Sequence, residues 1–315
     1  MALVVNTNIA SMNAQRSLAA NTNDMKTAME RLSTGKAINS AADDAAGFAI
    51  SETMTAQIRG LSMAAKNSSD ALGLLKVVEN ATNDVTDMLQ RIRELAVQAN
   101  SGTNSTGDIA NLQKEAEALM DEIERVSQDT TYNNQAYLGA GADALTGGQV
   151  KIQVGYNDGD VIDVGVYNIH TGNLGHRSVD ATTGAVTFAS DTANESLTWD
   201  DTGVKKYLDI TLQQTVDATT GEVTAPGALQ VISDAITQVA SYKAEWGALQ
   251  NRLEYTVSNL MNVVEFTSAA RSRIQDADFA VEAANLAKAQ VLQQTGTAML
   301  AQANAAPQLA LQLLK

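Results

Sequence analysis

LGLLKVVENATNDVTDMLQRIRELAVQA, residues 72–99, determines which architecture this chain can adopt. Its apolar residues recur in alternating steps of three and four, which is the spacing of the contact seam in a coiled coil. The members of this seam are Leu72, Leu75, Val78, Thr82, Val85, Leu89, Ile92, Ala96 and Ala99. Only one of them, Thr82, is polar. The stretch therefore predicts a long helix that packs lengthwise against other helices.

Two further segments repeat this pattern. The loop SGTNSTG at 101–107 interrupts the first helix, and Asp108 is expected to cap the next one. Because the loop is short, the second helix should fold back antiparallel on the first through Ile109, Leu112, Ala116, Leu119, Ile123 and Val126. A third long helix, in which Gly247 lowers the intrinsic propensity, is marked by Leu229, Ile232, Ile236, Val239, Tyr242, Trp246, Leu249, Leu253, Val257 and Leu260.

The middle of the chain has the pattern of strands. Apolar and polar residues alternate over 150–156 and again over 162–166, and Asn157-Asp158-Gly159-Asp160 between them predicts a hairpin turn. Residues 168–225 are rich in Thr, Gly and Asp. Within them DATTGAVT at 180–187 recurs as DATTGEVT at 217–224, which we interpret as one turn used in two hairpins.

These elements predict a mainly α chain with a β-rich middle. Long antiparallel helices from both termini would form a coiled-coil rod, accompanied by a β-hairpin and a small β-rich outer domain. Burying three seams against one another favours a rod over a globule.

The two ends of the chain differ from its middle in charge. Residues 1–60 and 273–315 each hold equal numbers of acidic and basic side chains, so the formal net charge of −15 comes from the residues between them. After Glu282 the only charged residues are Lys288 and Lys315. Such a helix has little to keep it in water alone, so the ends are expected to pair with each other and with neighbouring subunits.

Composition and motifs exclude several classes of function. A sequence pI of about 4.5 argues against nucleic acid as a partner. The chain has no cysteine, no phosphate-binding glycine motif and no apolar run long enough to span a membrane. Its two histidines, His170 and His176, are interpreted as solvated loop residues and not as metal ligands, and the pair Asp43-Asp44 is expected to favour a helix start. No catalytic, cofactor-binding or metal-binding residue is predicted. The first residues also lack the basic and apolar regions of a secretory signal, so an exported chain is expected to keep its N-terminus.

Motifs at both ends resemble bacterial flagellin. The N-terminal ones are VNTNI at 5–9, RLSTG at 31–35, INSAADDAAG at 38–47, QIRGL at 57–61 and LQRIRELAVQ at 89–98. The C-terminal ones are ARSRIQDADFA at 270–280, LAQAN at 300–304 and Pro307-Gln308 followed by Leu313-Leu314-Lys315. The resemblance covers about 1–165 and 226–315, and together these motifs are highly specific.

The resemblance implies a subunit that self-assembles into the extracellular flagellar filament for swimming motility and has no enzymatic activity. It implies a terminal coiled-coil core domain (1–45 plus 273–315), a helical rod domain with a β-hairpin (46–167 plus 226–272) and a variable β-rich surface domain (168–225). The residues expected in the assembly core are Ile9, Met12, Met25, Met29, Leu32, Val291, Leu292, Met299, Leu300, Leu309, Leu313 and Leu314.

The same resemblance implies several partners. They are other copies of the chain, the flagellar type III export apparatus with its chaperone, the filament cap, the hook-associated proteins and a flagellin-sensing Toll-like receptor. The residues that match the receptor-contacting positions of the family are Arg91, Leu95 and Glu115. Departures from the usual family pattern occur at Lys36-Ala37, Ala42, Phe48 and Lys315, which puts particular salt bridges near residues 33–45 in doubt.

Three alternatives remain at this point. A hook–filament junction protein would share related termini but be used in few copies. A secreted membrane-active translocator would need a basic polar face, whereas residues 283–314 contain only Lys288. An enzyme would depend on His170 or an acidic pair for its chemistry.

Overall fold

The computed structural model describes residues 8–139, 148–175, 178–179, 186–187, 197–201, 204–213, 215–216, 223–225 and 227–313. The chain forms two compact units. The terminal unit comprises residues 1–60 and 262–315, and the central unit comprises residues 61–261. The helices are α1 (Ile9–Thr34), α2 (Ala45–Ala99), α3 (Thr106–Asp129), α4 (Ala228–Gln275) and α5 (Phe279–Leu313).

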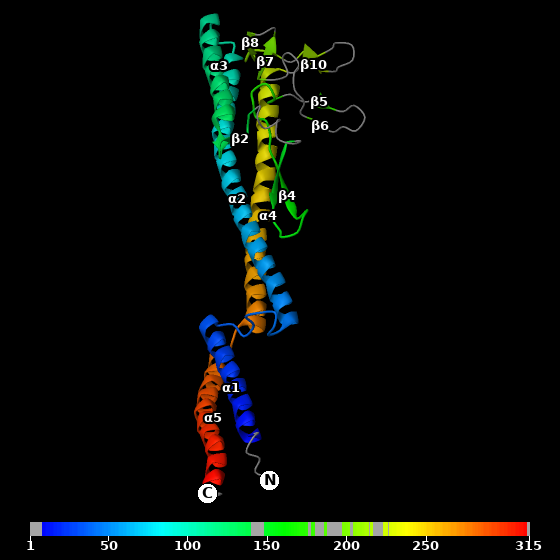
Figure 1. The fold of residues 1–315 in the computed structure, drawn as a ribbon. Coiled ribbons are helices and arrows are strands. Elements are labelled where there is room, and N and C mark those ends of the chain that lie inside the picture. Colours follow the sequence, from blue (N-terminus) through cyan, green and yellow to red (C-terminus); the bar gives the residue numbers. More distant parts are fainter. Residues whose placement is uncertain are drawn as a thin grey trace. The chain divides into compact units, whose positions relative to one another are not determined.

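The terminal unit contains an antiparallel pair of helices, α1 and α5 (Figure 1). Asn8 caps the start of α1 by accepting a hydrogen bond from the backbone N–H of Ser11. Gly35 ends the helix with φ +71°, a left-handed conformation that glycine adopts without steric cost. The two ends of the chain that the charge pattern predicted to pair do pair.

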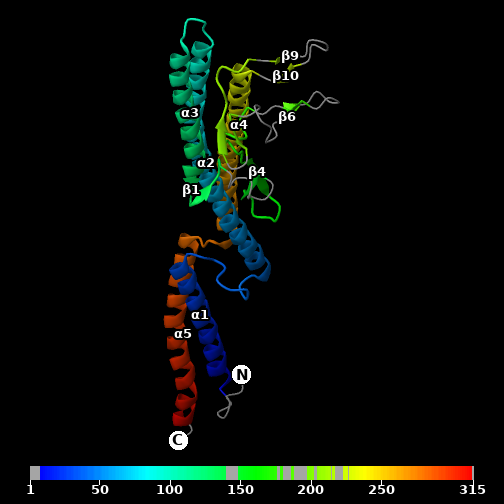
Figure 2. The same ribbon diagram turned by 90° about the horizontal axis from the view of Figure 1, so that it is seen from above.

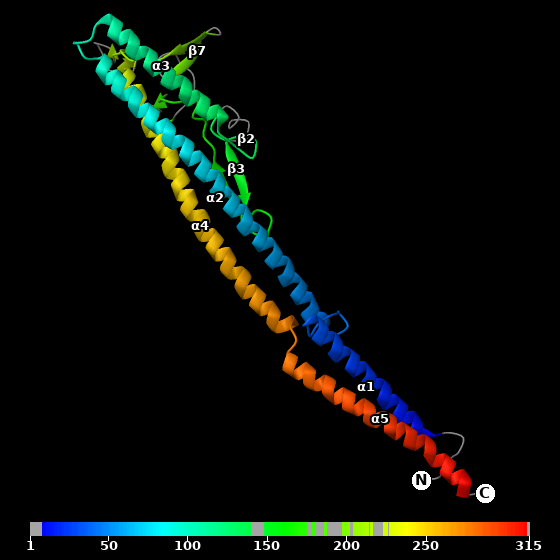
Figure 3. The same cartoon turned by 90° about the vertical axis from the view of Figure 1, so that its left-hand side faces the viewer.

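The central unit is built on the predicted seams of α2, α3 and α4, and Figure 3 shows α3 folded back beside α2. Thr82, the polar member of the first seam, is fully buried and donates from Oγ1 to the carbonyl of Val78 at 2.5 Å. Its hydroxyl is therefore satisfied inside the helix, which makes a polar seam position tolerable.

Two details of the predicted helices were wrong. Ser105, and not Asp108, is the N-cap of α3; Asp108 lies three residues later and completes a capping box with it. Leu229, placed in the third seam, is exposed, whereas Ala228 and Val231 are buried. The first turn of α4 therefore presents a different face to the core than its apolar spacing suggested.

The predicted hairpin at 150–166 is confirmed as β3 (Gln149–Gln153) paired with β4 (Val161–Gly165), with Val150 opposite Val164. A smaller hairpin, β1 (Thr131–Tyr132) with β2 (Gln135–Ala136), follows α3. The β3–β4 hairpin lies beside α4 (Figure 2), and the Trp246 indole Nε1–H donates to the carbonyl of Gly165 at 2.9 Å.

The described part of 168–225 holds three two-stranded ladders. β5 (Ser178–Val179) pairs with β6 (Val186–Thr187), β7 (Thr198–Asp201) with β8 (Val204–Tyr207), and β9 (Thr215–Val216) with β10 (Val223–Ala225). The closing Val-Thr of each copy of the repeated motif lies in the second strand of a hairpin, as the shared-turn interpretation predicted. The turn residues themselves lie outside the described residues.

Part of this β-rich segment is buried in the same core as the helices. Leu174, Leu197, Leu208 and Ile210 are fully buried in the same cluster as the residues of α2, α3 and α4. Gln113 of α3 donates from Nε2 to the Leu208 carbonyl and accepts from the Ile210 N–H, both at 3.1 Å. The β-rich segment is therefore anchored to the helices by packing and by backbone-directed hydrogen bonds.

Candidate assembly and recognition surfaces

The α1–α5 contact follows a heptad pattern on both helices. On α5, every buried or half-buried residue from 282 to 303 lies at alternating steps of four and three. We call the contact the α1–α5 seam; its members are Ser11, Ala14, Leu18, Asn21, Met25, Ala28 and Leu32 on α1, and Glu282, Leu286, Ala289, Gln293, Gly296, Leu300 and Ala303 on α5. The seam is rich in small and polar residues, so its apolar burial is modest for its length.

The residues expected in the assembly core divide between two surfaces. Met25, Leu32 and Leu300 lie in the α1–α5 seam and are half-buried. The others whose side chains are described lie outside the seam and are exposed, by 62% for Met299; they are Ile9, Met12, Met29, Val291 and Met299. Leu292, exposed by 39%, lies beside the seam and lines a pocket between α1 and α5. The side chains of Leu309 and Leu313, and all of Leu314, lie outside the described residues.

Polar contacts close both ends of the α1–α5 seam. At one end Asn8 donates from Nδ2 to the carbonyl of Ala303 at 2.7 Å, and Ser11 donates from Oγ to Asn304 Oδ1 at 2.7 Å. At the other end Arg31 Nη1 lies 3.0 Å from Glu282 Oε1, and that carboxylate is largely buried. Sequence reasoning missed these contacts, although a charged residue at a heptad position of a nearly uncharged helix was a signal for Glu282.

Beyond this ion pair, a short backbone ladder joins the segments that follow α1 and α4. The N–H of Ala277 donates to the carbonyl of Gly35 at 3.0 Å, and Ala37 donates to that of Gln275 at 2.7 Å. The carboxylate of Asp43 accepts from the backbone N–H groups of Ser40 and Asn39, which lowers its pKa below the ordinary value. Asp43 thus stabilises the turn before α2, and Asp44 accepts from the N–H of Ala46 at the helix start, as expected of this pair.

The three candidate receptor-contacting residues lie where α2 meets α3. Arg91 donates from Nη2 to Glu115 Oε1 at 2.9 Å and from Nη1 to Glu94 Oε2 at 3.0 Å. These two hydrogen-bonded carboxylates, that of Glu115 first, raise the pKa of the guanidinium. About half of each side chain of the Arg91–Glu115 pair is exposed, at 49% and 46%, whereas Leu95 is fully buried. A protein that bound this surface would therefore contact the ion pair and would not reach the buried side chain of Leu95.

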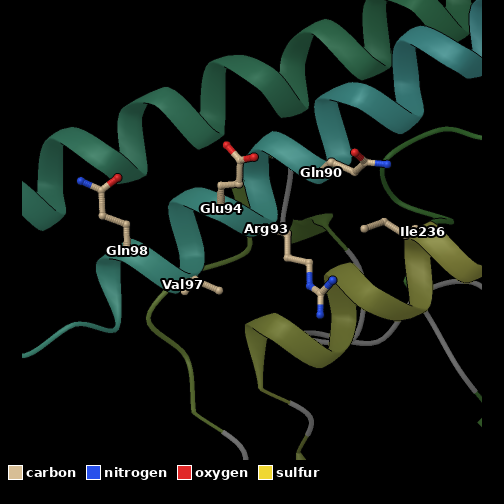
Figure 4. A pocket seen from close by; sticks show the side chains of 6 residues that line it. All are labelled: Gln90, Arg93, Glu94, Val97, Gln98 and Ile236. Atoms are coloured by element: carbon tan, nitrogen blue, oxygen red, sulfur yellow. The ribbon is translucent and has the colours of Figure 1, made fainter.

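A pocket of about 580 Å³ lies between α2 and α4 in the central unit, lined by Gln90, Arg93, Glu94, Val97, Gln98 and Ile236. Figure 4 shows Arg93 reaching from α2 toward α4, on which Ile236 lies, and Glu94 pointing toward α3. The lining combines two amide groups, one guanidinium, one carboxylate and two apolar side chains. Among the described lining residues, Glu94 is the one carboxylate; it accepts a hydrogen bond from Arg91, and no hydroxyl, thiol or imidazole accompanies it.

His170 was wrongly interpreted as solvated. It is half-buried, its Nε2 lies 3.2 Å from Glu124 Oε1, and its Nδ1 accepts from the N–H of Gly172 at 3.1 Å. The ring is thus held between α3 and the loop after β4. His176 lies outside the described residues. Within the described ranges no cluster of metal-ligating side chains occurs, and none of the helices combines the length and hydrophobicity needed to cross a bilayer.

Comparisons with known proteins find one family over both helical regions of the chain. Residues 5–142 match the model of the bacterial flagellin N-terminal helical region, and residues 229–314 match that of the C-terminal helical region. Flagellin of Bacillus subtilis is 39% identical, with 99% of both chains covered; flagellin of Halalkalibacterium halodurans is 38% identical, with 99% of this chain and 100% of the relative covered. The crystal structure of Bacillus cereus flagellin is 24% identical, with a TM-score of 0.42 over 62% of this chain and 88% of that one.

Proposed function

Because the chain belongs to the bacterial flagellin family, which both family models and near full-length relatives establish, we propose which part of the filament each segment of the chain forms. The chain is a structural subunit that self-assembles into the helical flagellar filament. We propose that residues 1–45 and 273–315 form the filament core, that 46–167 and 226–272 form the rod around it, and that 168–225 form the outer surface. In support, α1 ends at Thr34, α5 begins at Phe279 and the two helices pair.

The observation that carries the core assignment is the outward-facing set of apolar side chains on α1 and α5. Val291 and Met299 are exposed by 58% and 62% although their helices are already paired. Large apolar side chains on a helix surface gain stability only when another surface covers them. In a self-assembling chain, the chemistry that fits this surface is the same surface of neighbouring copies.

Deleting residues 300–315 tests this assignment. We expect the shortened chain to keep the helix content and the unfolding transition of the central unit, because its buried cluster lies within residues 71–253. We expect it to form no filaments when added to filament seeds, as judged by electron microscopy. Normal filaments from the shortened chain would refute the role of the terminal helices.

We further propose that the chain is not an enzyme and leaves the cell through the flagellar export apparatus with its chaperone, meeting the cap and hook-associated proteins outside. These partners follow from family membership. The hook–filament junction alternative has less support, because relatives named flagellin match over almost the whole chain. For receptor recognition through Arg91, Leu95 and Glu115, the support is the exposed Arg91–Glu115 pair. An Arg91→Ala, Glu115→Ala double variant that activates a flagellin-sensing receptor as strongly as the parent would rule out that site.

A further inference from the structure

The contacts along α1 and α5 define one antiparallel register. Asn8 meets Ala303 at one end and Arg31 meets Glu282 at the other, as described above. Between these ends Leu18 packs against Gly296, where an added Cβ would lie 3.2 Å from Leu18 Cδ1. The residue numbers in these three pairs have sums that differ by at most three, which is less than one helical turn, so one antiparallel register fits all three contacts.

This register pairs large seam residues with small ones. It places Ala14 opposite Leu300, Leu18 opposite Gly296, Met25 opposite Ala289 and Ala28 opposite Leu286. A large side chain from one helix thus fills the space that a small one leaves on the other, and each helix contributes two of the four large side chains. Such alternation lets two helices approach closely while keeping their packing dense.

Polar residues occupy the remaining layers. The register places Asn21 opposite Gln293 near the middle, with the Arg31–Glu282 pair at one end. A slip of one heptad would set Gln293 against Ala14 or Ala28 and would separate Arg31 from the largely buried Glu282 carboxylate. Each change leaves a polar group without a polar neighbour, and such mismatches are how single polar seam residues fix the register of coiled coils.

We propose that the α1–α5 seam specifies both which helix α1 pairs with and the single register of that pairing. Size alternation selects a helix with complementary small positions, and the Asn21–Gln293 and Arg31–Glu282 layers reject slipped pairings. One register then gives every subunit the same outward pattern of Met12, Met29, Val291 and Met299. The inference rests on the proposed core assembly, because uniform outer surfaces matter only if copies pack against them.

Cysteine pairs test the register, since the chain has no cysteine of its own. Met25→Cys with Ala289→Cys reports the observed register, and Leu18→Cys with Ala289→Cys reports a slip of one heptad; both pairs keep the Asn21–Gln293 and Arg31–Glu282 layers. Under mild copper–phenanthroline oxidation of assembled filaments, we expect the first pair to cross-link within a chain at least about ten-fold more than the second, because a slip abandons one charge pair and one amide layer. Equal cross-linking of both pairs would overturn the proposal.

A size swap tests the alternation. Gly296→Leu should reduce seeded polymerisation at least about ten-fold through overpacking against Leu18, although leucine is the better helix former. Adding Leu18→Ala should restore it, because the large and small positions are then exchanged. Gly102→Leu makes the same substitution in the exposed loop between α2 and α3, where an added Cβ meets no atom within 4 Å, and should leave polymerisation unchanged. Polymerisation of Gly296→Leu at the rate of Gly102→Leu would overturn the proposal.

These outcomes are separable from failure of the proposed function. If the unsubstituted chain formed no filaments on seeds, the proposed core assembly would fall. The two cysteine pairs would then be compared in the soluble chain, where preferential cross-linking of the first pair would still support the register and equal cross-linking would refute it.

Discussion

Gln238 of α4 forms hydrogen bonds with the backbone just before β5, and replacing it with leucine tests how much these bonds stabilise the central unit. The side chain is 2% exposed. Its Oε1 accepts from the N–H of Gly175 at 3.2 Å, and its Nε2 donates to the carbonyl of Asn173 at 3.2 Å and to the hydroxyl of Tyr242 at 2.9 Å. Leucine has a similar size but no polar atom. The N–H of Gly175 would therefore lose its partner while buried, and the carbonyl of Asn173 would lose its partner while half-buried.

A buried polar group left unsatisfied costs about 1–3 kcal/mol and a half-buried one somewhat less, so losing both backbone partners should lower the free energy of unfolding by about 2–5 kcal/mol. For a unit the size of residues 61–261 this corresponds to a fall in Tm of about 4–20 °C. Thermal unfolding followed by circular dichroism measures the effect. The matched control is Gln98→Leu, because Gln98 is exposed and its side chain makes no hydrogen bond among the described contacts. A Gln238→Leu variant no less stable than Gln98→Leu would refute the argument.

Three further predictions concern the central unit. Leu89→Ala should lower the free energy of unfolding by about 2–5 kcal/mol, because Leu89 is fully buried, whereas Val97→Ala at an exposed position of the same helix should change it by under about 0.5 kcal/mol; denaturant titration compares the two. Ser105→Ala should cost about 0.5–2 kcal/mol by removing the N-cap of α3, and Thr103→Ala in the same loop serves as the control in a thermal scan. Hydrogen bonds from the hydroxyl and then from the N–H of Ser105 lower the pKa of Asp108. The stability that the ionised carboxylate provides is therefore complete above the ordinary carboxyl pKa of about 3.9, and it is lost as the pH falls through the lower pKa of the folded state. Asp108→Asn should reduce the fall of Tm at acidic pH in a plot of Tm against pH.

Much of the helical architecture follows from the sequence because it depends on periodicity. Alternating steps of three and four located the α2 seam, and its members from Leu75 to Ala99 are buried. The β3–β4 hairpin was predictable for the same reason, since strict alternation and an Asn-Asp-Gly turn are local signals. Errors arose where neighbouring residues competed for one role. Ser105 and Asp108 are both good caps, and the geometry of the loop decided between them.

The candidate surfaces were less predictable because they depend on contacts between distant residues. Periodicity identifies an apolar residue but not which of two partners covers it, so Met25 and Met29 were assigned to one core although only Met25 lies in the α1–α5 seam. Similarly, a family motif marked Leu95 without revealing that its side chain is fully buried. The contacts of Gln113 and Gln238 with backbone groups leave no pattern in the sequence at all.

The antiparallel pairing of α1 with α5 determines when, during synthesis of the chain, α1 can acquire its partner. The bond from Asn8 to Ala303 joins residues 295 positions apart, and the ion pair of Arg31 with Glu282 joins residues 251 apart. Helix α1 is made first, yet it has no seam partner until almost the entire chain exists. A chain broken off before Glu282 would therefore carry an α1 that nothing completes. Only a polypeptide that includes α5 can bury the seam face of α1, so only a full-length chain can present the paired α1–α5 surface to its neighbours.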